Sequence, residues 1–186
     1  TAGMFAAASA PTFLLLHERA RPQPGADCGH AMRKAYTRVL HTLGHAAQFR
    51  DLRRFLACLV IYQAGVQAVI TIAAVYAQEA MGFTTRDSIV LILAVNVTAA
   101  LGAFAFGHFQ DRLGHVPTIA LTLAGWIATV VLAWLAETRS LFWLAANLAG
   151  LCLGASQSAG RALVGYLSPE DRRAEFFGLW GLAVKL

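Results

Sequence analysis

The amino-acid sequence predicts an all-α protein, a polytopic bundle of transmembrane helices. Three observations carry this prediction: uncharged runs of membrane-spanning length, a composition poor in charge, and basic residues gathered in alternate loops. Hydrophobic residues make up 58% of the 186 residues and charged residues 13%, against about 25% charged residues in an ordinary soluble domain. Such a composition leaves no room for a separate water-facing domain.

Four runs of 21 to 23 residues contain no Asp, Glu, Lys or Arg. A membrane core about 30 Å thick is crossed by roughly 20 apolar residues in a helix. Only helices and closed barrels satisfy their own backbone polar groups in lipid, and these runs are continuous rather than alternating. We therefore expect transmembrane helices over residues 55–77, 88–109, 116–136 and 140–160.

Both ends of the sequence resemble parts of further spans. Residues 1–16 are apolar and uncharged, without the basic start and cleavage site of a secretory signal. From about residue 174 the chain is apolar apart from Lys185 and covers about half a membrane. We expect a fragment of a longer polypeptide, with the end of one span at 1–16 and a truncated span from about 174.

The net charge of +5 is distributed unevenly among the loops. Eight Lys and Arg lie in residues 17–54, one in 110–115 and three in 161–173, so twelve lie on one side of the predicted membrane. The loops 78–87 and 137–139, on the other side, hold one each. The positive-inside rule makes the first group cytoplasmic. We interpret the charge as membrane topology and expect no nucleic-acid partner.

The long connection 17–54 begins with an irregular Pro-containing stretch and continues with apolar residues at helical spacing between basic ones. This pattern predicts a basic amphipathic helix on the inner membrane surface, and a solvated linker helix is the alternative. His41 and His45 are four residues apart, but a third metal ligand is missing. We expect no metal, no cofactor and no disulfide among the three cysteines.

Local patterns predict how the helices begin and pack. Thr84 with Asp87 forms a capping box before the second span, and Ser168 with Asp171, around Pro169, forms another. The short loop 137–139 makes the two spans that it joins antiparallel neighbours. Small residues recur every four positions in two spans, which favours close helix packing in lipid. They are Ala146, Gly150, Gly154 and Ser158 in one span, and Ala99, Ala103 and Gly107 in the other.

The spans contain amides but no acids. No catalytic motif is complete, because the GxSxG-like segment at 154–158 ends in Ser158 and the HExxH-like start at His17 lacks its second His. An amide in hydrocarbon needs a partner or water. The amides either hold helices together or line a solute path. Our candidates for the path are Gln63, Gln67, Asn96, Asn147 and Gln157.

The segment GHFQDRLGH, residues 107–115, is the most specific local signal. Gly107 lets two helix ends approach, Asp111 can accept backbone donors at the start of the next helix, and Arg112 can hold a carboxylate or a helix end. Gly114 allows a tight turn. Such a charged connection is a candidate gate, and an ordinary turn between two spans is the alternative.

This segment resembles the G-xxx-D-R-x-G signature of the major facilitator superfamily. Three flanking segments, PTFLLLHER, FLACLVIYQAGVQAV and the stretch from Gly154 to Lys185, are similar to its vacuole-effluxer-like branch, the autophagy-related amino-acid effluxer and its bacterial relatives. In that branch a Q-x-x-x-R segment, a Pro and an E-F-F-G run follow the tenth span. The matching residues are Gln157, Arg161, Pro169, Glu175, Phe176, Phe177 and Gly178.

The resemblance implies a partial major-facilitator fold, mainly its C-terminal half, from the end of the sixth span to the start of the eleventh. Residues 17–54 would be the central cytoplasmic loop and 55–186 the C-terminal bundle. One departure is that the Y-x-D-G segment of the branch is Tyr62 to Gly65 here, with alanine in place of the acid. Gln63 is a candidate substitute, and the coupling mode stays open.

We expect a secondary transporter, not an enzyme, that moves a small polar solute by alternating access in a bacterial-type inner membrane. An amino acid is the solute that the resemblance suggests, efflux its direction and a proton its candidate coupling ion. Asp111 and Arg112 are expected to stabilise the inward-closed state, and Arg161 to contact a gate or a phospholipid. The alternatives are a non-transporting scaffold or receptor derived from a transporter, and a membrane-embedded enzyme.

Overall fold

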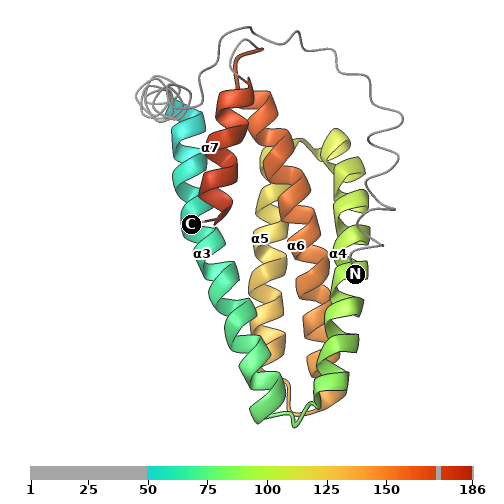
Figure 1. The fold of residues 1–186 in the computed structure, drawn as a ribbon. Coiled ribbons are helices and arrows are strands. Elements are labelled where there is room, and N and C mark those ends of the chain that lie inside the picture. The colour runs from blue at the N-terminus through green and yellow to red at the C-terminus, as the bar shows by residue number, and fades with distance from the viewer. Residues whose placement is uncertain (1–49, 171–172, 186) are drawn as a thin grey trace, which may run out of the picture. The chain divides into compact units, whose positions relative to one another are not determined.

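The computed structural model describes residues 50–170 and 173–185, which form helices joined by short loops (Figure 1). The helices are α3 (Arg50–Glu79), α4 (Thr85–Leu113), α5 (His115–Trp134), α6 (Arg139–Leu167) and α7 (Arg173–Lys185). No strand occurs in these two ranges. The prediction of an all-α transmembrane bundle is confirmed. The predictions for residues 1–49, including the amphipathic helix and the histidine pair, lie outside the described residues.

Three of the described helices are long and apolar enough to cross a membrane: α3, α4 and α5. Their outward faces carry large apolar side chains, such as Phe104 at 82% and Ile61 at 74% exposure, as lipid contact requires. The 29-residue helix α6 is not among the three. The span over 140–160 stays a prediction.

α6 lies against α4 along most of its length and also packs on α5. Gly154 and Gly150 make this closeness possible. A side chain on Gly154 would place its Cβ 2.6 Å from the carbonyl carbon of Ala99, and one on Gly150 would lie 2.6 Å from the Val95 oxygen. The helix backbones therefore touch directly, as the small-residue stripes predicted. α3 packs mainly on α7 and touches α6 and α4 only sparsely.

The loops at one end of the bundle, 80–84 and 135–138, are tied together by Arg139. Its Nε donates to the Met81 carbonyl at 2.9 Å and its Nη2 to the Gly82 carbonyl at 2.6 Å. The guanidinium also lies 5.5 Å from the centroid of the Phe83 ring. The positive-inside rule predicts that this end faces the exterior.

The predicted capping box at the start of α4 is confirmed. The Thr84 hydroxyl accepts from the Asp87 backbone N–H, and the Asp87 carboxylate accepts from the Thr84 backbone N–H at 3.0 Å. This backbone hydrogen bond, the Thr84 hydroxyl and the charges of Arg139 and Arg86 lower the pKa of Asp87 below its ordinary value. The start of α4 is therefore fixed by an ionised carboxylate.

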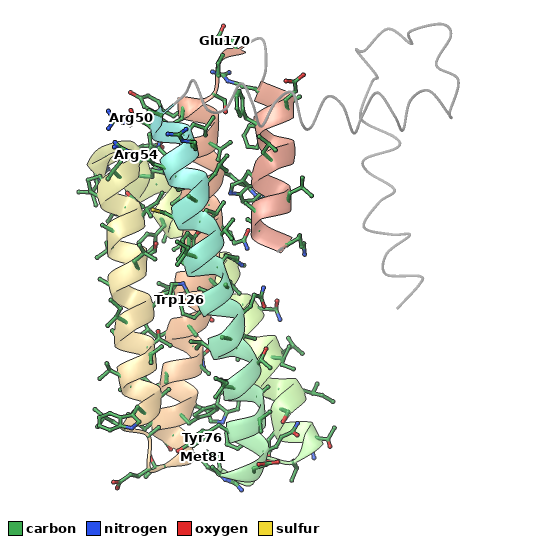
Figure 2. The ribbon with its side chains drawn as sticks, turned by 90° about the vertical axis from the view of Figure 1, so that its left-hand side faces the viewer. Arg50, Arg54, Tyr76, Met81, Trp126 and Glu170 are labelled. Carbon is green, nitrogen blue, oxygen red and sulfur yellow. The ribbon has the colours of Figure 1, made fainter. Side chains whose placement is uncertain are left out.

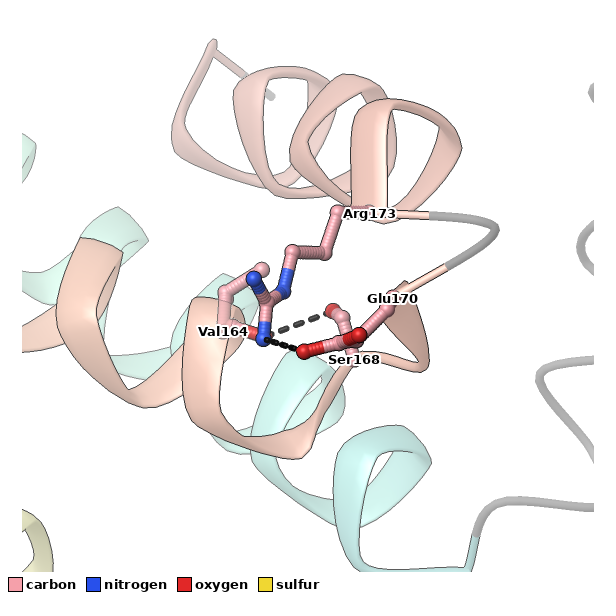
Figure 3. Close-up of polar contacts among 4 residues, drawn as sticks. All are labelled: Val164, Ser168, Glu170 and Arg173. Atoms are coloured by element: carbon pink, nitrogen blue, oxygen red, sulfur yellow. Dashed lines mark hydrogen bonds and ion pairs between the residues drawn. The ribbon is translucent and has the colours of Figure 1, made fainter.

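The second predicted capping box stays a prediction. Ser168 ends α6, where its hydroxyl donates to the Val164 carbonyl at 2.6 Å (Figure 3). The helix α7 begins at Arg173, whose guanidinium lies 3.7 Å from the Glu170 carboxylate across the turn. Both charges are largely exposed, so this ion pair adds little stability. The proposed partner Asp171 lies outside the described residues.

Candidate functional site

A cavity of about 360 Å³ lies between α3, α4, α5 and α6. It extends from the middle of the bundle, near Val69 and Leu153, toward the end that Arg139 ties together, near Ala77 and Ser88. Its walls are mainly alanine and branched aliphatic side chains. No Asp, Glu, Lys or Arg lines it. A molecule in this cavity would contact an apolar, uncharged surface with a few polar groups.

Three of those polar groups have no hydrogen-bond partner in the described part of the chain: Ser88 Oγ, Trp126 Nε1 and Thr129 Oγ1. Trp126 is only 6% exposed and Thr129 only 3%. The Thr129 hydroxyl has the Cys152 thiol beside it, but a thiol is a weak partner. Trp126 lies midway between the ends that carry Arg54 and Tyr76 (Figure 2). The cavity wall thus offers an indole N–H and two hydroxyls.

The buried face of α5 consists of Thr118, Thr122, Trp126 and Thr129. The first two hydroxyls are satisfied within their own helix, where Thr118 donates to the Gly114 carbonyl and Thr122 to the Ile119 carbonyl, each at 2.7 Å. Only the two residues beside the cavity retain unpaired groups. The sequence interpretation missed this face, although its spacing of four, four and three residues is a helical signal.

A second group of hydrogen-bond donors lies nearer the other end, around Gly160. Trp180 of α7 is 9% exposed, and its Nε1 also lacks a partner within the described residues. A Cβ at Gly160 would lie 3.4 Å from this nitrogen and 4.0 Å from the Tyr62 hydroxyl of α3. The guanidinium carbon of Arg161 lies 5.1 Å from the centroid of the Trp180 ring. Donors from three helices thus lie around Gly160, and we call the space left by its missing side chain the gap.

The two donor groups are joined along one line, which we call the α3–α6 seam. Tyr62 packs against the cluster that contains Trp180 and also against the cluster that contains Trp126. Within the described residues, four buried side-chain N or O atoms lack a hydrogen-bond partner; three belong to residues that line the cavity, and the fourth lies beside Gly160. They belong to Ser88, Thr129, Trp126 and Trp180.

Gln110 forms the centre of a junction between α4, α5 and α6. It is 3% exposed, and its Nε2 lies 2.7 Å from His115 Nδ1 and donates to the Ala159 carbonyl at 3.2 Å. An amide nitrogen only donates, so His115 Nδ1 is the acceptor and the ring proton is on Nε2. The His115 ring also lies 4.9 Å from the Tyr166 ring, between centroids. Both residues lie in the segment GHFQDRLGH, but the sequence predicted no role for either.

A family model described as "Vacuole effluxer Atg22 like" matches residues 1–185. The chain belongs to this family. No curated protein and no solved structure matches the chain. Membership identifies the protein as a transporter-like membrane protein of the effluxer type and confirms the resemblance to the major facilitator superfamily. Family membership points to a transporter-like function.

The five amides proposed for the solute path of this effluxer-like protein lie on different faces. Gln63 is 5% exposed and shares a face of α3 with Val66 and Ile70, so it continues the α3–α6 seam. Gln157 is half-buried and lies one helical turn beyond Leu153, which lines the cavity. These two amides lie between the two donor groups of the seam.

Within the described residues, no hydrogen bond joins the remaining three amides to Gln63 or Gln157. Asn96 lines the cavity but is exposed, and its Nδ2 donates to the Ile92 carbonyl of its own helix at 2.8 Å. Asn147 does the same with the Trp143 carbonyl at 2.8 Å, and Gln67 is exposed. In the part of the chain that the structure describes, no hydrogen bond connects any two of the five amides.

The proposed gate residues lie at the α4–α5 connection of this Atg22-like chain. Gly114 joins the two helices with φ of 88°, which favours glycine, and a Cβ at Gly107 would lie 3.6 Å from Ser158 Oγ. Asp111 is an exposed residue inside α4, and no side chain caps α5. The expectation that Asp111 accepts backbone donors at the start of α5 is therefore wrong. Arg112 lies in the last turn of α4, where a cation is favourable.

Arg161 and Glu175 complete the residues proposed from the family motif. Arg161 is exposed and contacts the Trp180 ring. Glu175 is half-buried in the first turn of α7, where the helix dipole favours an acid. Both residues therefore lie around the end of the bundle that the loop charges predict to be cytoplasmic.

Proposed function

We propose that the protein is a secondary active transporter of a small polar solute, with amino acids as the candidate solutes, and that it works by alternating access in a bacterial-type inner membrane. The observation that carries the proposal is the set of unpaired polar atoms in the cavity and beside Gly160. Leaving a buried donor without a partner costs about 1–3 kcal/mol. A polar solute or its water would provide the missing partners.

The packing of the helices supports movement along this seam. α4, α5 and α6 are tightly packed, with direct backbone contact at Gly154 and the Gln110 junction at one end. α3 contacts α4 and α6 only sparsely, whereas α7 packs on both α3 and α6. The seam lies where α3 faces these three helices. A rocking motion of α3 away from them would expose the seam and leave their packing intact.

Gln63 and Gln157 are the predicted solute contacts that this arrangement favours, because both lie on the seam. Asn96 is a contact at its cavity end. Gln67 and Asn147 would reach the path only if their helices moved. Protons remain the candidate coupling ion, and membrane lipid is expected to cover the apolar outer faces of α3, α4 and α5.

The test is solute flux into proteoliposomes that contain the purified protein, with each protein amino acid supplied as a labelled solute under an imposed proton gradient. Trp126→Phe removes the indole N–H but keeps the ring. Trp134→Phe is the matched control, because Trp134 is 81% exposed. Loss of one neutral hydrogen bond predicts a two- to tenfold lower kcat/KM, about 0.5–1.5 kcal/mol, for Trp126→Phe and no change for the control. Absence of flux for every solute would favour a receptor or scaffold instead.

A further inference from the structure

We infer that the gap beside Gly160 is a binding site for a carboxylate group of the transported solute. This inference deepens the proposed function and rests on it only in calling the solute transported. The binding site itself does not depend on transport. The gap lies where α3, α6 and α7 meet, and each helix directs a hydrogen-bond donor to its surroundings.

The chemistry of the gap is that of an anion site. The Trp180 indole N–H can only donate, and the Arg161 guanidinium has five donor hydrogens and no acceptor. The Tyr62 hydroxyl can also donate. Trp180 Nε1 is buried without a partner in the described part of the chain, and the contact that Arg161 makes there is with the Trp180 ring. An oxygen-rich anion would satisfy all three groups together.

Within the described residues, the nearby carboxylates do not fill this role. Glu170, in the α6–α7 turn, pairs with Arg173. α6 carries no Asp or Glu. Glu175 lies in the first turn of α7, more than one turn before Trp180, and has another interaction in the structure. On α3, Asp51 pairs with Arg54 at 3.9 Å, three turns from Tyr62, and Glu79 is at the opposite end. None of these side chains therefore provides the carboxylate that the donors around Gly160 could bind.

Gly160 determines the size of the gap. A Cβ there would lie 3.4 Å from Trp180 Nε1 and 4.0 Å from the Tyr62 hydroxyl, which are ordinary van der Waals distances. Gly160→Ala should therefore fold normally, with a methyl group between the donors. The methyl group would exclude a carboxylate from hydrogen-bonding distance of the indole N–H. Gly178→Ala in α7 is the matched control, because a Cβ at Gly178 meets nothing within 4 Å.

The experiment measures binding by calorimetry to the purified protein in phosphatidylcholine nanodiscs. The probes are the protein amino acids and their primary amides, titrated one at a time. We expect at least one amino acid to bind about ten- to a hundredfold more tightly than its amide, the range for a hydrogen bond to a charged group. Gly160→Ala should abolish this ratio, Trp180→Phe should reduce it, and Gly178→Ala should leave it unchanged. Circular dichroism verifies folding of each variant.

The outcomes separate this inference from the proposed function. An unchanged ratio in Gly160→Ala, or no binding of any amino acid, overturns the carboxylate site, whether or not flux is observed. A ratio that Gly160→Ala abolishes supports the site even if proteoliposomes show no flux, in which case only the transport proposal fails. The variants are also compared in nanodiscs that contain phosphatidylglycerol. If Gly160→Ala changes only the response of the protein to this lipid, the donors bind a lipid phosphate and the solute site is overturned.

Discussion

Gln110 Nε2 lies 2.7 Å from His115 Nδ1, across the break between α4 and α5. The same nitrogen reaches the Ala159 carbonyl of α6 at 3.2 Å. The Ala159 carbonyl fixes the orientation of the amide, because a reversed amide would face one oxygen with another. One side chain thus connects three helices at the end of the bundle predicted to be cytoplasmic.

Gln110→Leu should destabilise the protein by about 1–3 kcal/mol, the cost of leaving buried polar groups without partners. Both the Ala159 carbonyl and His115 Nδ1 lose their donor. Thermal unfolding in detergent, followed by circular dichroism, measures the change. The matched control is Gln67→Leu, since Gln67 is an exposed glutamine of α3. Equal unfolding temperatures for the two variants would contradict the role of the junction.

Asp111→Asn should change transport without changing stability. Asp111 is exposed and makes no ion pair within the described residues, so its unfolding free energy should change by no more than about 0.5 kcal/mol. We expect a shift in cytoplasmic accessibility to thiol reagents, because Asp111 and Arg112 are proposed to stabilise the inward-closed state. Wild-type flux and labelling rates in Asp111→Asn would exclude this gate.

Gly154→Ala should be strongly destabilising, by about 1–3 kcal/mol or more. The added methyl group would lie 2.6 Å from the Ala99 carbonyl carbon and 2.9 Å from the Ala103 nitrogen, which are backbone atoms that cannot move aside. Gly65→Ala serves as the comparison, because nothing lies within 4 Å of its added Cβ. That variant should gain up to about 1 kcal/mol from helix propensity. Thermal unfolding of both variants tests the direct contact of α4 and α6.

The capping box makes the start of α4 sensitive to acid. The folded-state pKa of Asp87 is below its ordinary value of 3.8, first because of the hydrogen bond from the Thr84 backbone. A depressed pKa stabilises the fold above pH 3.8, and this stabilisation disappears as the pH falls through the lower folded-state value. The difference in unfolding temperature between wild type and Asp87→Asn should therefore be constant near neutrality and narrow below pH 3.8. A difference in unfolding temperature that does not depend on pH would contradict the capping box.

Local sequence patterns predicted much of the fold. The uncharged runs indicated the helices, the Thr84–Asp87 pair marked a helix start, and the stripe around Gly154 indicated the close packing of α4 and α6. Each pattern depends on residues within a few positions or on composition, which a sequence displays directly. The second pair, Ser168 with Asp171, stays a prediction, because Asp171 lies outside the described residues.

The site was less predictable, because its geometry joins distant positions. Tyr62, Gly160 and Trp180 come from three helices, and nothing local indicates that their side chains meet. The buried threonines of α5 were overlooked because threonine is tolerated on any face of a transmembrane helix, where its hydroxyl bonds to its own backbone. Gln110 and His115 lie only five residues apart, but their contact depends on how the chain turns at Gly114.

Arg139 ties together two loops at one end of the bundle. Its two hydrogen bonds join the α3–α4 loop to the start of α6, so we expect this end to move least and to act as a pivot. A helix of 29 residues such as α6 is about 43 Å long. A tilt of about 10° between two helices of this length displaces their far ends by about 7 Å by the same geometry. The tied end hardly moves. The largest opening is then expected at the Gln110 and Gly160 end, with the widest excursion farthest from Arg139.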